Sequence, residues 1–251
     1  MRTNGTETTM GLSRSREDYL RLIYELGCDG EEVGVSALAG RLGISAASVT
    51  GMAKRLAGAG LVDRTPYRGL ALTGEGRRAA LGVVRRHRLI ELYLVEALGY
   101  SWDEVHEEAE TLEHAASECF VDRLERLLGY PEVDAHGFPI PTSEGEVVEN
   151  AYVSLAGLGV GKRVAIRRVL DRAPEVLRHL AGMELTLGAE LELVERHPFE
   201  GPLIVASGGK NLVVSPKLAR HVFVEPVPVR GEYGAGRTGL PRRATLAKGS
   251  Q

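Results

Sequence analysis

The chain has 251 residues, of which 43% are hydrophobic, 26% charged and only 5% aromatic. This length predicts two domains with room for a small third one, and the composition excludes a disordered polymer and argues against a large antiparallel β protein. The sequence has no apolar run long enough for a membrane helix, no secretory signal at its N-terminus, and only two cysteines, Cys28 and Cys119. We therefore expect a cytoplasmic protein without a disulfide framework or a membrane partner.

Charge is distributed unevenly along the chain. Between Arg41 and Arg88, ten basic and two acidic residues give a local net charge of +8. Between Leu89 and Asn150, sixteen acidic and two basic residues give −14. This segregation predicts a polyanionic partner for the first segment and cations for the second. Charge alone does not exclude the alternative, a solvated basic face beside a solvated acidic helix.

The first predicted domain, residues 13–74, has the element order of a winged helix. Apolar residues at helical spacing predict a helix over 17–26. Two shorter helices follow over 36–42 and 46–57, opened by Ser36 and Ser45 as caps, with Gly43 in the turn between them. Residues 60–73 alternate apolar and polar side chains around a turn at 66–69, which predicts a β-hairpin.

The rest of the chain predicts a helical domain and a small β domain. Thr73 is expected to cap a helix that runs to about Leu98, and helices over 101–116 and 117–128 complete a helical domain, residues 75–141. An acidic linker, 142–150, leads to short β-branched runs with one helix among them, predicted to form a β-barrel over 151–229. The ends, 1–12 and 230–251, are expected to be disordered. The predicted fold class is therefore mainly α with a C-terminal β-barrel.

The second helix of the helix-turn-helix and the hairpin carry side chains suited to DNA. Small side chains on the outer face of the helix allow a close approach to base edges, while basic ones reach phosphates. An unrelated helical hairpin is the alternative, but the +8 charge and the hairpin that follows favour nucleic acid. The predicted contacts are Ser45, Ala47, Ser48, Thr50, Gly51, Lys54 and Arg55 on the helix, with Arg64, Tyr67 and Arg68 on the wing.

The acidic middle segment carries histidines and carboxylates at helical spacing. Four of these residues follow an i, i+4, i+7, i+8 pattern, which predicts that they share one face of one helix. They are His106, Glu110, Glu113 and His114, and His87 with Glu91 forms an i, i+4 pair upstream. Such a stack repels itself unless a cation lies within it. A solvated acidic face is the alternative, but the interleaved histidines favour a divalent ion.

Signatures of other chemistries are missing from the sequence. No glycine-rich phosphate loop has the required spacing, and there is no G-x-S-x-G elbow and no C-x-x-C. We therefore predict no enzyme activity and no small-molecule substrate. A helical metalloenzyme centred on Glu110, Glu113 and His114 is the alternative from another class, and the basic winged helix argues against it.

These features together resemble the DtxR/MntR family of metal-dependent transcriptional repressors, in its long three-domain form. The resemblance covers roughly residues 10–226 and is carried by the segments Asp18–Leu26, Ser48–Thr50, Tyr67–Leu70, Arg86–Glu91, Val105–His114 and His136–Pro141. It implies a homodimer whose winged helices dock on palindromic operator DNA once metal is bound. It also implies that the third domain is SH3-like, of the FeoA type.

The resemblance places the primary metal site at Asp18, Glu110, Glu113 and His114. Iron-sensing members carry methionine and cysteine where Asp18 and Glu110 stand, and carboxylate oxygen in place of sulfur shifts the preference toward Mn²⁺. Fe²⁺ is the alternative ion, and Co²⁺, Ni²⁺, Cd²⁺ or Zn²⁺ are expected to substitute in vitro. Shorter manganese sensors carry a glutamate where this chain has Arg21, which argues against their closely spaced pair of metals here.

The family builds its second metal site in two ways, and this chain has residues for both. The iron-type set is His87, Glu91 and His106; the manganese-type set is Glu91, Asp134, His136 and Asp171 of the third domain. A metal at the primary site would join the first domain to the second and so fix the spacing of the two recognition helices in a dimer. The expected function is therefore a manganese-responsive repressor of metal-uptake genes.

An apolar surface on the helical domain is predicted to form the dimer interface. Paired DNA-binding domains need a two-fold axis to match a palindromic operator. The predicted face comprises Leu89, Leu92, Tyr93, Leu94, Leu98, Phe120, Leu124, Leu127 and Leu128.

Overall fold

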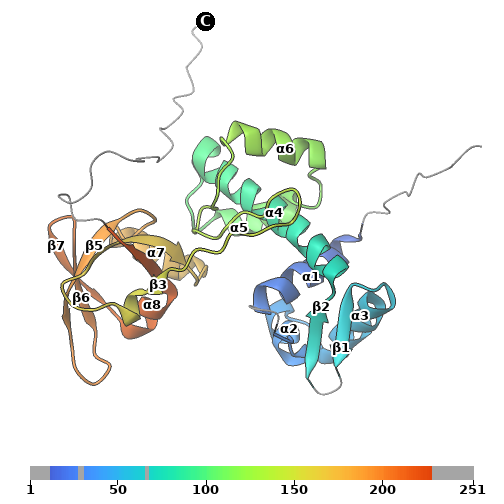
Figure 1. Cartoon of the computed structure of the whole chain (residues 1–251), viewed down its shortest axis with the longest axis horizontal. Helices are drawn as coiled ribbons and strands as arrows, with labels where there is room; N and C mark the ends of the chain where they lie inside the picture. Colours follow the sequence, from blue (N-terminus) through green and yellow to red (C-terminus); the bar gives the residue numbers. More distant parts are fainter. Residues whose placement is uncertain (1–11, 28–30, 66–67, 228–251) are drawn as a thin grey trace, which may run out of the picture.

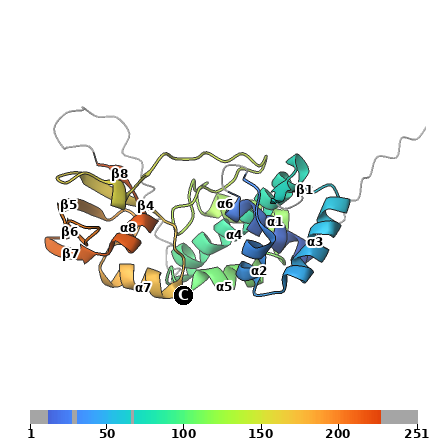
Figure 2. The ribbon, with the colours of Figure 1, turned by 90° about the horizontal axis from the view of Figure 1, so that it is seen from below.

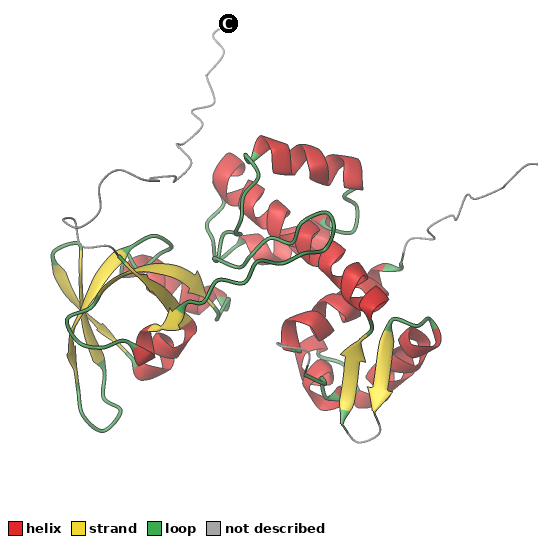
Figure 3. Cartoon of the chain, in the orientation of Figure 1, coloured by secondary structure: helices red, strands yellow, loops and turns green. Residues whose placement is uncertain are grey.

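The computed structural model describes residues 12–27, 31–65 and 68–227, which fold into three regions in chain order (Figure 1). Figure 3 shows a helical region with one hairpin, a second region of helices and loops, and a third region built on a sheet. The segments predicted to be disordered lie outside the described residues apart from Leu12, as do Cys28 and Tyr67. Within the described ranges, no helix has the length and apolar character needed to cross a membrane.

The first region is a winged helix. It consists of α1 (Arg14–Leu26), α2 (Val35–Leu42), α3 (Ala46–Gly58) and the antiparallel strands β1 (Val62–Thr65) and β2 (Gly69–Leu72). The Ser45 hydroxyl accepts a hydrogen bond from the Ser48 amide, so the predicted cap of α3 is confirmed. The predicted cap at Ser36 is wrong: α2 begins at Val35 after Gly34, because backbone hydrogen bonds between Val33 and β2 fix the chain just before the helix.

The second region consists of α4 (Gly74–Leu98), α5 (Val105–Leu112) and α6 (Glu118–Leu127). Thr73 caps α4 through its hydroxyl, as predicted, and the Ser117 hydroxyl caps α6. The predicted single helix over 101–116 is too long, because α5 ends at Leu112 and Ser117 opens a new helix soon after. Glu113 and His114 therefore lie in the turn beyond α5 rather than within one continuous helix with His106 and Glu110.

The third region is an open, curved sheet rather than the predicted closed barrel. Its strands are β3 (Val153–Ser154), β4 (Arg163–Val169), β5 (Glu190–Arg196), β6 (Leu203–Ser207), β7 (Lys210–Val214) and β8 (Val222–Pro226), paired in the order β3-β8-β4-β5-β6-β7. The two edge strands, β3 and β7, do not pair with each other in the described part of the chain. The short β3 offers only two residues for pairing, and α8 (Pro216–His221) packs beside it. A helix, α7 (Pro174–Gly182), completes the region.

The third region is fixed to the second through the loop that follows α6. The Val169 amide donates to the His136 carbonyl at 3.0 Å, and Arg168 Nε donates to the Gly137 carbonyl at 3.1 Å. A Cβ on Gly137 would lie 1.9 Å from the Arg167 carbonyl oxygen, so only glycine permits this approach. Figure 2 shows α7 beside α5 at this junction, where Arg178 also pairs with Asp103 at 3.1 Å.

Some residues of the face predicted for dimerisation are buried within the protomer, and others are exposed. Leu89, Leu94 and Leu124 lie inside the protomer's own core with α5, so they cannot contact a partner and this part of the prediction is wrong. The amphipathic pattern did not separate the side of α4 that faces α5 from its outer side. Leu98, Phe120 and Leu127 are exposed and remain available to a second subunit.

Candidate metal centre and nucleic-acid interface

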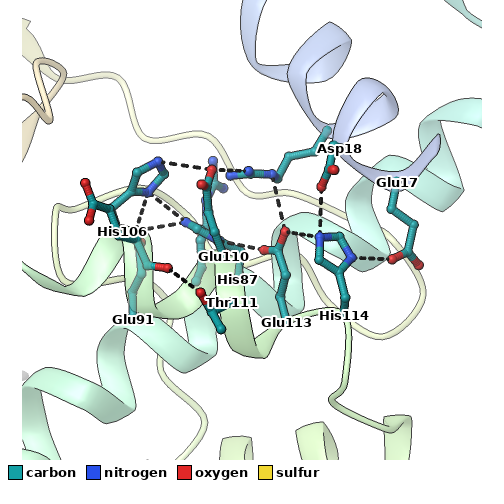
Figure 4. Close-up of polar contacts among 12 residues, drawn as sticks. Glu17, Asp18, His87, Glu91, His106, Glu110, Thr111, Glu113 and His114 are labelled. Carbon is teal, nitrogen blue, oxygen red and sulfur yellow. Dashed lines mark hydrogen bonds and ion pairs between the residues drawn. The ribbon is translucent and has the colours of Figure 1, made fainter. Parts of the chain in front are cut away.

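Three side chains from two regions converge beside the N-terminal half of α1. His114 Nε2 lies 2.8 Å from Asp18 Oδ1 and 3.2 Å from Glu113 Oε1 (Figure 4). Their ligand atoms are close enough together to hold one metal ion. Asp18 belongs to α1 of the winged helix, whereas the other two follow α5. We call Asp18, Glu113 and His114 the cross-domain group.

The donor chemistry of the cross-domain group fits a cation. His114 Nε2 and Glu113 Oε1 are buried and have no hydrogen-bond partner. A neutral ring nitrogen and two carboxylates are all acceptors, so a proton or a metal ion must lie between them. Burial and the nearby Glu113 raise the pKa of Asp18 against the opposing effect of His114 and Arg21.

Glu17 orients the His114 ring through the nitrogen that faces away from Asp18 and Glu113. Its Oε2 accepts a hydrogen bond from His114 Nδ1 at 2.8 Å, and its Oε1 accepts one from Arg86 at 2.7 Å. A carboxylate on the far nitrogen leaves Nε2 with its lone pair toward Asp18 and Glu113, which is how metal-binding histidines are commonly held. Sequence reasoning missed Glu17, although its place next to Asp18 on α1 was a usable signal.

A second set of donors, the His87 group, comprises His87, Glu91 and His106. Glu91 Oε1 lies 2.9 Å from His87 Nε2 and 3.1 Å from His106 Nδ1, and the two ring nitrogens are 3.1 Å apart. His87 and Glu91 are fully buried on α4, while His106 reaches them from α5 (Figure 4). These atoms also lie close enough together for one metal ion.

His87 connects this group to the cross-domain group, because its Nδ1 lies 2.7 Å from Glu113 Oε2. Burial alone would lower the pKa of His87, but Glu91 and the hydrogen bonds to both carboxylates outweigh it and raise the pKa to about 9. The pKa of Glu91 is well below its usual value because the facing histidines outweigh the effect of burial. A proton on His87 therefore faces both carboxylates, and Arg172 and Arg21 add positive charge beside Glu91 and Glu113.

The remaining set, the His136 group, comprises Glu91, Asp134 and His136, all buried. His136 Nε2 hydrogen bonds to the Trp102 carbonyl at 2.8 Å, which turns Nδ1 toward Glu91 Oε2 at 3.6 Å. Both of these atoms, and Asp134 Oδ2, are buried without a hydrogen-bond partner. The donors thus fit a cation, and because Glu91 is shared, the His136 group and the His87 group are neighbours within one cluster.

Glu110 and Asp171 lie apart from the groups that the resemblance assigns them to. Arg21 Nη2 donates to Glu110 Oε1 at 2.5 Å, and Glu110 is therefore turned toward Arg21 and His106. Burial would raise the pKa of Glu110, but Arg21 lowers it below its usual value. Asp171 pairs with His221 at 3.4 Å and lines a cavity of about 290 Å³ between α7 and α8.

The residues predicted to contact DNA form an exposed surface on the winged helix. Ser45, Ala47, Ser48, Gly51, Lys54 and Arg55 are exposed along α3, with Thr50 half-buried. Val49, Met52 and Leu56 on the opposite side are buried in the core, so the outer face of α3 is free of apolar bulk. Arg64 and Arg68 are exposed on the hairpin, and Tyr67 lies outside the described residues.

Comparison with known proteins identifies the same three regions. Residues 11–70 match the iron-dependent repressor N-terminal DNA-binding domain, and residues 73–142 match the iron-dependent repressor metal-binding and dimerisation domain. Residues 153–226 match the FeoA domain.

Full-length relatives and solved structures agree with these matches. The chain is 34% identical over 227 residues to the iron-dependent repressor IdeR of Mycobacterium tuberculosis, with 84% of this chain and 96% of that protein covered. It is 30% identical over 223 residues to the diphtheria toxin repressor of Corynebacterium diphtheriae, with coverage of 83% and 96%.

Among solved structures, a manganese-dependent transcriptional repressor in complex with manganese superposes with a TM-score of 0.77 at 37% identity, covering 84% of this chain and all of that one. ScaR with bound Cd²⁺ gives 0.73 at 32% identity, covering 84% and 99%. The matched domains are those of DNA-binding regulators that dimerise and bind metal, not of enzymes. The chain therefore belongs to the DtxR/MntR family of metal-dependent transcriptional repressors.

Proposed function

We propose that this protein is a manganese-responsive repressor of metal-uptake genes that acts in the cytoplasm as a homodimer on palindromic operator DNA. The observation that carries the proposal is the cross-domain group. Asp18 from the DNA-binding domain meets Glu113 and His114 from the dimerisation domain, and the facing Nε2 of His114 and Oε1 of Glu113 are buried acceptors without a hydrogen bond. A divalent ion bound there would supply the missing positive charge to both domains at once.

The residues around the group explain why the metal would control orientation. Without a metal ion, only His114 and Arg21 offset the facing carboxylates of Asp18 and Glu113, so the contact between α1 and the turn after α5 would be weaker than with metal bound. Glu17 holds the His114 ring, and α1 packs along α4, so a tighter contact at Asp18 would fix the angle of the whole winged helix. In a dimer, that angle sets the separation of the two α3 helices and their exposed residues.

Oxygen donors support manganese as the physiological ion. The cross-domain group offers two carboxylates and one imidazole and contains no sulfur, a donor set that suits Mn²⁺. Relatives named for manganese are found among the similar structures, whereas relatives named for iron are found among the similar sequences. An iron-responsive regulator on the same structure is therefore the second candidate. We propose Glu110 as a further primary ligand once it is released from Arg21.

Selection of DNA fragments tests the function. Genomic fragments from the source organism would be captured on purified protein with and without Mn²⁺, and sequenced. We expect enrichment of inverted-repeat sequences near metal-uptake genes only with metal. Equal recovery of the same fragments with and without metal would contradict metal-dependent regulation.

A double substitution tests the choice of ion. Asp18→Met with Glu110→Cys introduces sulfur donors, which stabilise later metals more than Mn²⁺. Operator binding by native and substituted protein would be titrated with Mn²⁺, Fe²⁺, Co²⁺ and Zn²⁺. The native protein should be activated by Mn²⁺, and the variant should respond preferentially to Fe²⁺ or Co²⁺. Identical metal rankings would remove Asp18 and Glu110 from the selectivity argument.

A further inference from the structure

Arg172, in the turn between β4 and α7, contacts residues from both other domains. Its Nη2 lies 3.4 Å from Glu25 Oε1 on α1, and its Nη1 lies 3.9 Å from Glu91 Oε1 on α4. Its guanidinium lies 5.1 Å from the centre of the Phe138 ring, in the loop that joins the second region to the third. The side chain is only 12% exposed. One buried arginine of the FeoA domain therefore touches the DNA-binding domain and the dimerisation domain.

The Glu25 carboxylate continues this contact toward the cross-domain group. Glu25 also lies 3.8 Å from Arg21 Nη1, one turn earlier on α1, and Arg21 in turn faces Glu110 and Glu113. Burial would raise the pKa of Glu25, but Arg172 and Arg21 outweigh it and lower the pKa. Charges of alternating sign therefore run from the FeoA domain along α1 to the residues after α5.

The segment that carries Arg172 is held against the dimerisation domain. The backbone hydrogen bond from Val169 to His136 and the close approach at Gly137 fix this part of the FeoA domain to the dimerisation domain. Arg172 follows β4 by only a few residues, and its stacking on Phe138 holds the guanidinium in place. The pair of Arg172 with Glu25 thus connects α1 to the FeoA domain and, through it, to the dimerisation domain. This connection is separate from the cross-domain group.

We propose that Arg172 is a positioning residue through which the FeoA domain holds α1, and with it the DNA-binding domain, in its orientation against the dimerisation domain. The contact is made by the two side chains alone, so it would pre-order the arrangement that metal binding would complete. A pre-ordered protein needs less metal to reach the same DNA-binding state. Only the DNA-binding readout of this proposal rests on the function proposed above.

A double-mutant cycle tests the pair. Arg172→Gln and Glu25→Gln would be made singly and together in the full chain, and operator binding would be titrated with Mn²⁺. Each single variant should raise the Mn²⁺ concentration for half-maximal binding about fivefold. The double variant should add little to either one, because both remove the same contact. Additive effects, or no effect of Arg172→Gln, would overturn the proposal.

Hydrogen exchange in the metal-free protein provides a readout that does not depend on DNA binding. Arg172→Gln should speed exchange of the α1 amides while amides of β5 and β6 in the FeoA domain keep their native rates. Faster exchange confined to the FeoA domain would assign Arg172 a merely structural role there and contradict the proposal. If the native protein showed no metal-dependent DNA binding, this comparison would still decide the role of Arg172.

Matched controls separate this pair from surface charge in general. Arg167→Gln with Glu225→Gln removes an exposed ion pair of 3.0 Å within the FeoA domain and should leave both readouts unchanged. If Arg172→Gln fails to fold, Arg172→Lys keeps the charge but loses the two-armed contact and the stacking on Phe138. Arg172→Lys should also raise the Mn²⁺ concentration for half-maximal operator binding. A native Mn²⁺ concentration together with native exchange rates of the α1 amides would count against the proposal.

Discussion

The cross-domain group and the His136 group present similar donors in different places. Asp18, Glu113 and His114 come from two domains that meet at α1, whereas Glu91, Asp134 and His136 all belong to the dimerisation domain and are fully buried. A cation in the first group would link the DNA-binding domain to the dimerisation domain. A cation in the second strengthens a domain that is already packed. From this comparison we infer that the position of a metal group across a domain boundary, more than its donor types, would determine whether metal binding controls DNA binding.

The largest expected effect is on Glu113, which serves the cross-domain group and also contacts His87. Glu113→Gln keeps the size of the side chain but removes the charge, so we expect metal-activated operator binding to fall about 100-fold or more. Glu107→Gln, on the exposed face of α5, is the matched control and should bind like the native protein. Operator titration at fixed Mn²⁺ measures both. If Mn²⁺ activated operator binding by Glu113→Gln as it does in the native protein, the cross-domain group would not control DNA binding.

A smaller effect on DNA binding is expected from His136→Gln. This change should lower the thermal stability gained on adding metal and reduce the number of bound ions, while operator affinity at saturating Mn²⁺ changes less than about tenfold. Thermal unfolding with and without Mn²⁺, together with native mass spectrometry, measures these quantities. A loss of operator binding as large as that of Glu113→Gln would show that position across the boundary does not matter.

The pH dependence of the metal-free protein should sharpen the comparison further. A histidine whose pKa is raised on folding adds stability below its unfolded-state pKa of about 6.5, and this stability is lost as the pH rises through its folded pKa. For His87 the folded pKa is about 9. We therefore expect the free energy of unfolding to fall between about pH 6.5 and 9 without metal. Mn²⁺ should remove much of this loss, because metal replaces the proton.

Chemical denaturation across this pH range measures the effect. His87→Gln, which cannot titrate there, should flatten the curve and serves as the control. A native protein whose metal-free stability is unchanged or rises over the same interval would contradict the assignment of a proton to the His87 group.

The smallest effect on operator binding is expected from changes at the DNA-binding surface, which lies outside both metal groups. Arg64→Ala removes an exposed wing charge, so we expect it to weaken binding to all sequences similarly and to reduce the salt slope by about one. Ser48→Ala should instead change which operators are preferred. Binding to several sequences over a salt series distinguishes the two. An altered sequence preference with an unchanged salt slope for Arg64→Ala would refute the contact assignment.

Local signals in the sequence predicted much of the fold. Ser45 and Thr73 cap the helices that they were expected to cap, because a hydroxyl before an apolar periodic run acts on amides only a few residues away. The two-residue strand β3 left no periodic signal, and α8 was overlooked although Ser215 and Pro216 form a recognisable helix start. The open edge of the third domain depends on these short elements.

The site was predictable in its residue types but less so in its grouping. Periodicity brought out the histidines and glutamates of α4 and α5 as candidates. It could not show that Glu110 faces Arg21, or that Glu25 meets Arg172, since these pairs are 89 and 147 residues apart and depend on how the domains pack. Pairing across domain boundaries carries no local sequence signal.

The most direct test of the central claim is reciprocal linkage between Mn²⁺ and operator DNA. If a metal ion in the cross-domain group couples the two domains, the factor by which saturating Mn²⁺ raises operator affinity must equal the factor by which operator raises Mn²⁺ affinity. Operator affinity would be measured by fluorescence anisotropy and Mn²⁺ affinity by electron paramagnetic resonance of the free ion, for native protein and Asp18→Asn.

The account predicts equal factors of at least about tenfold in the native protein and a factor near one in Asp18→Asn. Mn²⁺ affinity that does not respond to operator DNA, or full coupling in Asp18→Asn, would contradict it.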